Sequence, residues 1–129
     1  MESRHISCVI ATTPERVYNF AADPDNLPKW AGGLAKADVR RVADTLVVDS
    51  PMGEVTVRFG SRNGFGVLDH DVTLPSGTTV NNPLRVIAHP DGAEVIFTVR
   101  QIELTDDEFD RDCRMVARHL EMLKRALES

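Results

Sequence analysis

The sequence predicts an α+β fold in which a curved antiparallel β-sheet packs against a long C-terminal helix, with two short helices after the first strand. Three observations predict it: a strand-then-helix opening over residues 6–30, alternating apolar and polar residues between Trp30 and residue 104, and a helical pattern from residue 105. A period of two residues is typical of a half-buried strand, and a period near 3.6 residues of an amphipathic helix.

The opening predicts one strand and two helices in quick succession. Residues 6–11 form a short apolar strand. Thr13 is a favourable helix N-cap and Pro14 suits the first helical position, so a helix should begin there. The Asp23–Pro24 pair should end it, and a second short helix is expected from residue 25 to Trp30. The first helix presents an apolar stripe made by Val17, Tyr18, Phe20 and Ala21.

The middle of the chain predicts strands joined by tight turns. A loop is expected over 31–36, and turn residues follow at 43–44, 50–53, 62–64, 75–77 and 90–92. Short connections between successive strands indicate hairpins, and therefore antiparallel pairing. Pro83 should cause a bulge or mark a sheet edge, because proline has no N–H to donate. The expected strands cover residues 39–42, 46–48, 55–59, 67–74, 80–88 and 95–102.

The last segment predicts a helix over 105–127. Thr105 and Glu108 have the spacing of a capping box, in which each side chain bonds the other residue's backbone N–H. Since this helix is the only element large enough to cover one face of the sheet, either a filled core or a cavity is expected between them. Its apolar face comprises Phe109, Cys113, Val116, Leu120, Leu123 and Leu127.

Composition limits the classes of partner. The 129 residues suit a single domain, residues 1–129, and the net charge of −5 argues against nucleic acid and anionic membranes. Without a leader-like start or a long apolar run, a cytoplasmic protein without membrane insertion is expected. Cys8 and Cys113 fit small buried apolar positions. The histidines and cysteines do not have the spacing of metal ligands, so no metal site is expected. The sequence contains no phosphate-loop or dinucleotide-binding motif, so no cofactor is expected.

Three segments carry a resemblance to a known superfamily. They are TPERVYNFAADPDNLPKW at 13–30, GVLDHDV at 66–72 and TDDEFDRD at 105–112. With the order of elements, they make the chain similar over its full length to the START-like superfamily (SRPBCC, polyketide cyclase-like), which has the helix-grip fold. The resemblance implies that a small apolar molecule binds in a cavity beneath the last helix.

Strand alternation separates side chains that face this space from those that face solvent. His70 shares parity with Leu68, Val72 and Leu74, so it should face the apolar side, whereas Asp69 and Asp71 should face solvent. The same rule on residues 94–100 places Thr98 outward. The expected lining of the cavity is Tyr18, Trp30, Phe59, His70, Asn82, Phe97 and Leu120.

Each polar side chain expected to face the cavity could have either a functional or a purely structural role. His70 could act as an acid–base residue or bond a ligand oxygen, or it could be a core histidine satisfied by a backbone carbonyl or by Asn82. Asn82 also suits a turn beside Pro83, and Tyr18 and Trp30 suit a core or cavity wall better than a reactive role.

Three functions therefore remain open. The first is binding of a small apolar molecule in an internal cavity. The second is a polyketide cyclase-like or aromatase-like enzyme, in which His70 is the acid–base residue and Asn82 or Tyr18 holds an oxygen. The third is a structural or partner-binding domain with a filled core. The sequence names neither the ligand nor the oligomeric state.

Overall fold

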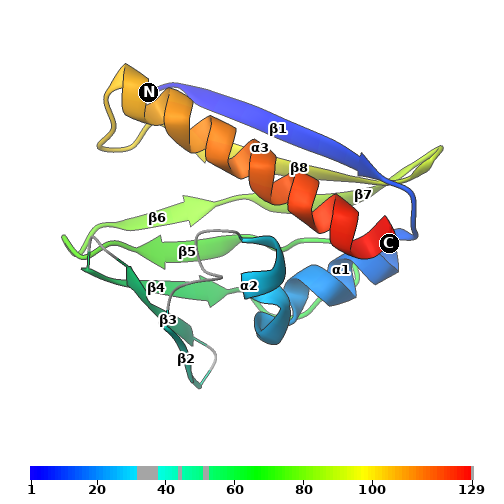
Figure 1. Cartoon of the computed structure of the whole chain (residues 1–129), viewed down its shortest axis with the longest axis horizontal. Helices are drawn as coiled ribbons and strands as arrows, with labels where there is room; N and C mark the ends of the chain where they lie inside the picture. Colours follow the sequence, from blue (N-terminus) through cyan, green and yellow to red (C-terminus); the bar gives the residue numbers. More distant parts are fainter. Residues whose placement is uncertain (32–37, 44, 51–52, 129) are drawn as a thin grey trace.

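The computed structural model describes residues 1–31, 38–43, 45–50 and 53–128, and confirms the predicted α+β class (Figure 1). The predicted loop over 31–36 lies outside the described residues except for Ala31, as do parts of the predicted turns at 43–44 and 50–53. The elements are β1 (Ser3–Ile10), α1 (Pro14–Ala22), the 3-10 helix η1 (Pro24–Asn26), α2 (Leu27–Trp30), β2 (Asp38–Val42), β3 (Thr45–Ser50), β4 (Gly53–Phe59), β5 (His70–Thr73), β6 (Thr79–Asn82), β7 (Leu84–His89), β8 (Gly92–Arg100) and α3 (Asp106–Glu128).

The predicted antiparallel pairing is confirmed, but the strands form two sheets rather than one. The sheets have the orders β1-β8-β7 and β2-β3-β4-β5-β6, and they separate at Pro83, between β6 and β7. Proline cannot donate to a strand neighbour, so the pairing of β6 stops there. The segment just before β5 is bonded to β7 of the other sheet: Leu68 N–H donates to the Leu84 carbonyl (2.8 Å), and Val86 N–H donates to the Gly66 carbonyl (2.9 Å).

The strand predicted over 67–74 is shorter in the structure, because its first part belongs to this connection. Val67 forms an isolated antiparallel bridge with Arg85, and β5 itself begins at His70. Gly66 has φ +73° and lies against the Val86 carbonyl, so the chain turns sharply just before the bridge. The consequence is that His70 is placed where the two sheets meet.

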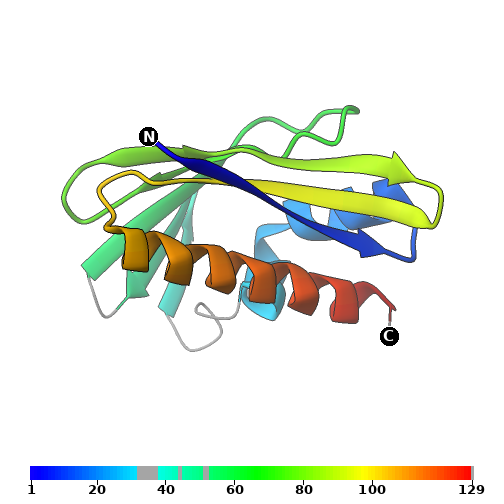
Figure 2. The same cartoon turned by 90° about the horizontal axis from the view of Figure 1, so that it is seen from above.

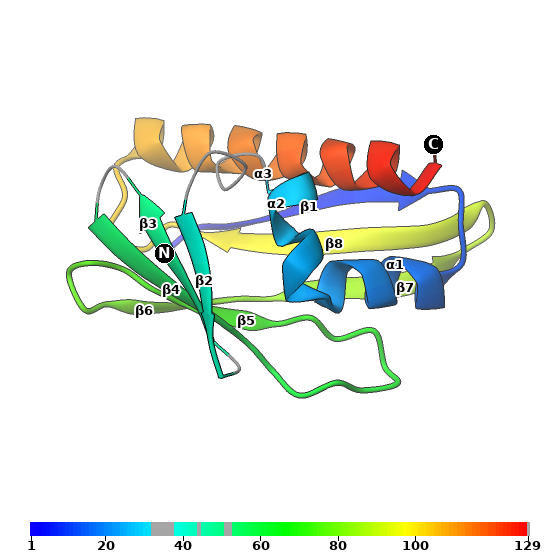
Figure 3. The ribbon, with the colours of Figure 1, turned by 60° about the horizontal axis from the view of Figure 1, so that its bottom comes forward.

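The short helices predicted after the first strand are present as α1, η1 and α2, and they form a corner against the sheets. The Thr13 hydroxyl accepts from Arg16 N–H (3.2 Å), and the Asp23 carboxylate accepts from Asp25 N–H (3.0 Å), so the starts of α1 and η1 are both capped. Figure 3 shows α1 beside β7 and α2 turned toward α3. This corner brings Asp23 close to the ends of β4 and β5.

Helix α3 runs along the three-stranded sheet, in contact with β1 and β8 (Figure 2). The predicted capping box is present: Thr105 N–H donates to the Glu108 carboxylate (2.9 Å), and Glu108 N–H donates to the Thr105 hydroxyl (3.2 Å). The other end of α3 is fastened to β1, because the Lys124 ammonium donates to the Val9 carbonyl (2.8 Å). All six residues of the predicted apolar face are buried.

The main core lies between the sheets and the helices. Leu46 and Val57 from the five-stranded sheet share one buried cluster with Trp30 of α2 and with Leu120 and Leu123 of α3. Both cysteines are free; Cys113 is buried as predicted, whereas Cys8 is half-buried. No helix in the described part of the chain is long and apolar enough to cross a membrane.

The prediction for Thr98 is wrong. Alternation places its side chain on the face of β8 that points away from the core, but Thr98 is buried there rather than exposed. Its hydroxyl lies 2.8 Å from Nδ1 of His5, the residue paired with it on β1. The neighbouring strand's imidazole therefore contributes to covering a position that periodicity alone assigns to solvent.

Candidate functional site

His70 is the buried titratable group around which the candidate site is built. It opens β5, is 8% exposed, and is paired with Phe59 on β4 and Asn82 on β6. As alternation predicted, its side chain is buried. Of the two aspartates beside it, Asp69 bonds Arg85 on β7 and Asp71 bonds Asn81 on β6.

Two phenylalanines surround the His70 ring. The ring centroids of His70 and Phe59 are 4.8 Å apart with an interplanar angle of 32°, and those of His70 and Phe97 are 5.7 Å apart at 70°. The second arrangement is the edge-to-face geometry that aromatic pairs favour. Three strands, β4, β5 and β8, thus bring three rings together, although β8 belongs to the other sheet.

A backbone carbonyl fixes the tautomer of His70. Nδ1 lies 3.0 Å from the Leu68 carbonyl, which accepts but cannot donate, so Nδ1 carries the proton. The neutral ring then presents a bare lone pair on Nε2. No described residue hydrogen-bonds Nε2, so this nitrogen is able to accept a bond from another molecule.

The environment keeps the imidazole neutral. Burial lowers the pKa of His70 below its ordinary value of 6.5, because desolvation penalises the charged ring. The bond to Leu68 and the charges of Asp69 and Asp71 act in the opposite direction but are weaker. Near pH 7, His70 is therefore an acceptor at Nε2 and a potential proton acceptor in chemistry.

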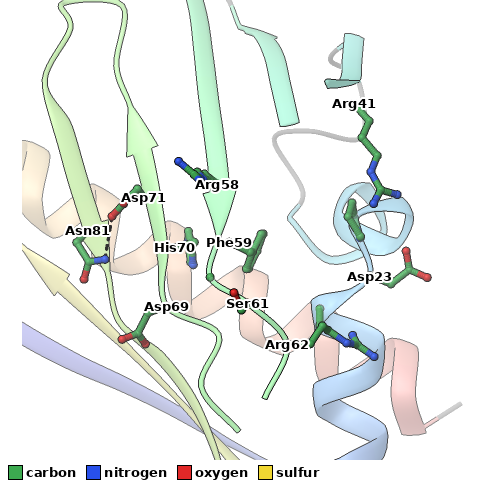
Figure 4. A pocket seen from close by; sticks show the side chains of 13 residues that line it. Asp23, Arg41, Arg58, Phe59, Ser61, Arg62, Asp69, His70, Asp71 and Asn81 are labelled. Atoms are coloured by element: carbon green, nitrogen blue, oxygen red, sulfur yellow. Dashed lines mark hydrogen bonds between the residues drawn. The ribbon is translucent and has the colours of Figure 1, made fainter. Parts of the chain in front are cut away.

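An open groove of about 990 Å³ runs over the ends of β4 and β5 beside the α1–η1 corner (Figure 4). Phe59 and His70 give it an aromatic part, and side chains of both charges give it a polar part. Its lining comprises Ala22, Asp23, Pro24, Arg41, Arg58, Phe59, Gly60, Ser61, Arg62, Asp69, His70, Asp71 and Asn81.

Several polar side chains of the groove already have protein partners. Asp69 binds Arg85 through both carboxylate oxygens, and this bond lowers the pKa of Asp69. Asp71 accepts from the Asn81 amide (2.9 Å). Arg62 donates to the Asn19 amide oxygen (3.1 Å) and lies over the Tyr18 ring. These contacts hold the polar side chains of the groove in place, whereas no described residue hydrogen-bonds Nε2 of His70.

The predicted lining residues are placed in different environments. Phe59 and His70 line the groove, and Phe97 contacts His70 from behind. Asn82 is half-buried opposite His70, and Leu120 is fully buried in the core. The Tyr18 hydroxyl accepts from Asn63 N–H (2.9 Å), which fixes it to the loop after β4.

Trp30 is 3% exposed, and its indole N–H has no hydrogen-bond partner among the described residues. A buried donor left in this state costs about 1–3 kcal/mol relative to a satisfied one. Native structures rarely retain such a group without a reason. Trp30 belongs to the core cluster against which Phe59 and Phe97 pack, and it is not among the residues that line the groove.

The polar wall of the groove was missed from the sequence. Sequence patterns place Asp23 at a helix end and Arg62 in a turn, and they indicate no role for Arg41, Arg58 or Ser61. A signal was present, because charged residues gather at 58–62 and 69–71, the facing ends of two successive strands. What was lacking is the position of the α1–η1 corner, which turns these strand ends into one side of a groove.

A second, shallower depression of about 480 Å³ lies between β1 and α3. Arg4 crosses it, bonded to Asp110 (2.7 Å) and stacked over the Phe109 ring. Burial raises the pKa of the Cys113 thiol at its edge, so that cysteine remains protonated and unreactive. Among the described residues, no three His, Cys, Asp or Glu side chains are placed to hold a metal ion.

Comparison with known proteins shows the fold. No family model matches the chain, and no curated protein matches it. Solved structures match over nearly its whole length: the Aha1 dimer from Colwellia psychrerythraea has a TM-score of 0.76 at 20% identity, covering 99% of this chain and 97% of that one. Protein CV1439 from Chromobacterium violaceum has a TM-score of 0.76 at 15% identity, and the match covers 100% of this chain and 99% of that one. XoxI from Bacillus cereus has a TM-score of 0.75 at 15% identity, and the match covers 98% of this chain and 96% of that one. At these identities the likeness establishes a shared architecture alone.

Proposed function

We propose that this protein is a START-like (SRPBCC) domain that binds a small, mainly apolar molecule against the Phe59–His70–Phe97 rings, entering through the groove beside the α1–η1 corner. One observation carries the proposal: a buried imidazole in contact with two phenyl rings lines an open groove, and no described residue hydrogen-bonds its Nε2.

The chemistry of these groups favours binding of a planar or ring-shaped body. Ligand sites combine an apolar, aromatic surface with a few polar groups that fix orientation. Phe59 supplies the aromatic surface, His70 supplies one acceptor, and the charged wall of the groove remains hydrated around the entrance. The groove lies beside the α1–η1 corner and has no lining residue from α3, so it opens at a different place from the space beneath the last helix that the sequence resemblance implies.

Catalysis is the second candidate, and the state of His70 favours it. A neutral imidazole with a bare Nε2 is suited to act as a general base on a bound molecule. However, a backbone carbonyl, rather than a carboxylate, bonds Nδ1, and Asp69 and Asp71 are already bonded to Arg85 on β7 and Asn81 on β6. An imidazolium formed during a reaction would lack a hydrogen-bonded anion, so binding ranks ahead of turnover.

Titration with anilinonaphthalene sulfonate, a fluorescent apolar probe, tests the proposal. Saturable binding is expected for the native protein, and Phe59→Ala should weaken it roughly tenfold, because an aromatic contact is lost. Phe65→Ala is the matched control, since Phe65 is 86% exposed on the loop after β4 and does not line the groove. Native mass spectrometry of the purified protein then identifies any co-purified molecule.

Two results would point elsewhere. Absence of saturable binding to the folded protein would favour the third function, a structural or partner-binding domain with a filled core. Once a ligand is identified, His70→Phe separates binding from turnover: a binder loses affinity, whereas an enzyme retains affinity and loses product formation.

A further inference from the structure

We infer that the molecule bound in this groove is a neutral phenol, whose aromatic ring lies against Phe59 and whose hydroxyl group donates to Nε2 of His70. The inference rests on the proposed function and deepens it, because it assigns the chemical class of the ligand. It follows from one nitrogen that no described residue hydrogen-bonds, and from the phenyl ring that lines the groove beside it.

Nε2 of His70 is accessible from the groove. His70 is 8% exposed and lines the groove, and none of the described residues hydrogen-bonds Nε2. In the described part of the chain, one side-chain nitrogen or oxygen is both fully enclosed and without a partner, and that atom belongs to Trp30. Nε2 also lacks a partner, so it is not fully enclosed. A small molecule in the groove can therefore reach it.

The polarity of Nε2 selects a hydrogen-bond donor. The Leu68 carbonyl holds the proton of His70 on Nδ1, so Nε2 presents a lone pair. A hydroxyl group donates to this lone pair, whereas an ether or carbonyl oxygen presents a lone pair of its own. A ligand of the second kind displaces water from Nε2 without replacing its hydrogen bond, which lowers the affinity. The ligand therefore has an O–H group at this position.

Phe59 determines the kind of body that carries this hydroxyl. Its ring lines the same groove, and its centroid is 4.8 Å from that of His70 (Figure 4). The two residues are paired across β4 and β5, so a ligand bonded to Nε2 has the phenyl ring next to it. An aromatic ring gains more than an aliphatic one from this contact. A hydroxyl attached to an aromatic ring is also a stronger donor than an alcohol.

The charges next to His70 favour a neutral ligand. Asp69 and Asp71 precede and follow His70, line the groove, and act electrostatically on the imidazole. A ligand carboxylate at Nε2 would face these two anions as well as the lone pair. Arginines elsewhere in the lining offer an anion a second place to bind, and a test must include an anionic probe for that reason. These arginines are Arg41, Arg58 and Arg62.

Three naphthalene probes test the assignment at neutral pH: naphthol, its methyl ether and naphthoate, all substituted at the same ring position. Naphthol is uncharged at this pH and should bind roughly three- to tenfold more tightly than the ether, the effect of one hydrogen bond. Naphthoate should bind more weakly than naphthol. His70→Phe, which keeps a ring but has no acceptor, should abolish the preference for naphthol over the ether. His89→Gln, at the end of β7 and outside the groove, is the control and should preserve it.

Nitrogen NMR of the native protein gives a second readout, which does not depend on a variant folding. The acceptor nitrogen of a neutral imidazole moves upfield when it receives a hydrogen bond. The Nε2 signal of His70 should therefore lie upfield in the naphthol complex relative to the ether complex. Nδ1, which is bonded to the Leu68 carbonyl, should have the same position in both. The ring currents of the two probes are alike and cancel in this comparison.

The outcomes separate this inference from the proposed function. If naphthol and its ether bind saturably with equal affinity, or leave the Nε2 signal at the same position, the inference is overturned while the binding function stands. Tightest binding of naphthoate also overturns the inference, because it would assign the arginines as the anchor of an anionic ligand. If no probe binds saturably, the proposed function fails and the inference with it.

Discussion

Both carboxylate oxygens of Asp69 accept hydrogen bonds from the guanidinium of Arg85, across the boundary between the two sheets. The distances are 2.8 Å from Nε to Oδ1 and 2.7 Å from Nη2 to Oδ2. The oxygen nearer Nε also accepts from Leu84 N–H (3.0 Å), the first residue of β7. One side chain thus connects the residue before β5 to the strand after Pro83. It bridges the break in the pairing next to His70.

Asp69→Asn should lower the free energy of unfolding by about 1–2 kcal/mol at neutral pH, because one charge-assisted bidentate contact is lost. The value is modest because half of the Arg85 side chain is exposed and solvent screens the pair. The Arg85 bond lowers the pKa of Asp69, so this stabilisation is present above the unfolded value of 3.8 and is lost as pH falls through the lower folded value. Urea denaturation across acidic pH measures it. Asp91→Asn, at the exposed β7–β8 turn, is the control; an equal loss there would contradict the role of Asp69.

The ring protons of His70 should titrate with a pKa below 6.5, because burial outweighs its other interactions. Between that lowered value and 6.5, the unfolded chain binds more protons than the folded one, so stability rises with pH through this window. On acidification from about pH 7 to about pH 5, the native protein should lose stability relative to His70→Phe, which has no such proton to gain. NMR titration and denaturation at each pH measure both effects. A pKa at or above 6.5 would remove the case for a neutral acceptor.

Leu120→Ala should cost about 2–5 kcal/mol of unfolding free energy, since the side chain is fully buried between α3 and the sheets. Met115→Ala on the exposed side of the same helix should cost well under about 1 kcal/mol. Chemical denaturation of both variants measures the contrast. Comparable midpoints would show that the buried face of α3 has been assigned incorrectly.

Gly66→Ala should lower the unfolding free energy by at least about 2 kcal/mol. Gly66 has φ +73°, and a methyl group there would lie 2.2 Å from the Val86 carbonyl oxygen. Gly64→Ala in the same loop is the matched control, because its methyl group would meet no atom within 4 Å. If the two variants unfold at the same denaturant concentration, the close approach of the loop to β7 does not contribute to stability.

The elements of the fold could be predicted because each has a local cause. Thr13, Thr105 and Glu108 cap their helices through residues three positions away, and the parity of His70 with Leu68 and Val72 depends only on the geometry of one strand. The partners of each strand are not local. Nothing around Val67 indicates that it bridges Arg85 rather than extending β5, and nothing around Thr98 indicates that His5 covers it.

The features of the candidate site also separate into those that follow from local sequence and those that depend on the tertiary fold. The inward position of His70 and its ring neighbour Phe59 follow from alternation within β4 and β5. The groove does not, because Asp23 comes from a helix corner and Arg58 and Asp69 from strand ends, and only the folded chain brings them together. The unused indole N–H of Trp30 is also a tertiary property, since it depends on the absence of any acceptor among the described side chains that enclose it.

The pairing of β1 with β8 couples folding to synthesis. Ser3 lies opposite Arg100, and Ile10 lies opposite Ala93. More than eighty further residues must therefore be synthesised after β1 before its hydrogen-bond partner exists. Helix α3, which covers the same strand, is made later still. While the ribosome is translating the middle of the chain, β1 has a free backbone edge and an uncovered apolar face. Such delayed, long-range pairing is slow and leaves a chain open to association with others. The three-stranded sheet and its cover by α3 therefore form only after β8 has left the ribosomal tunnel, whereas strands β2 to β6 pair with successive neighbours that are made earlier.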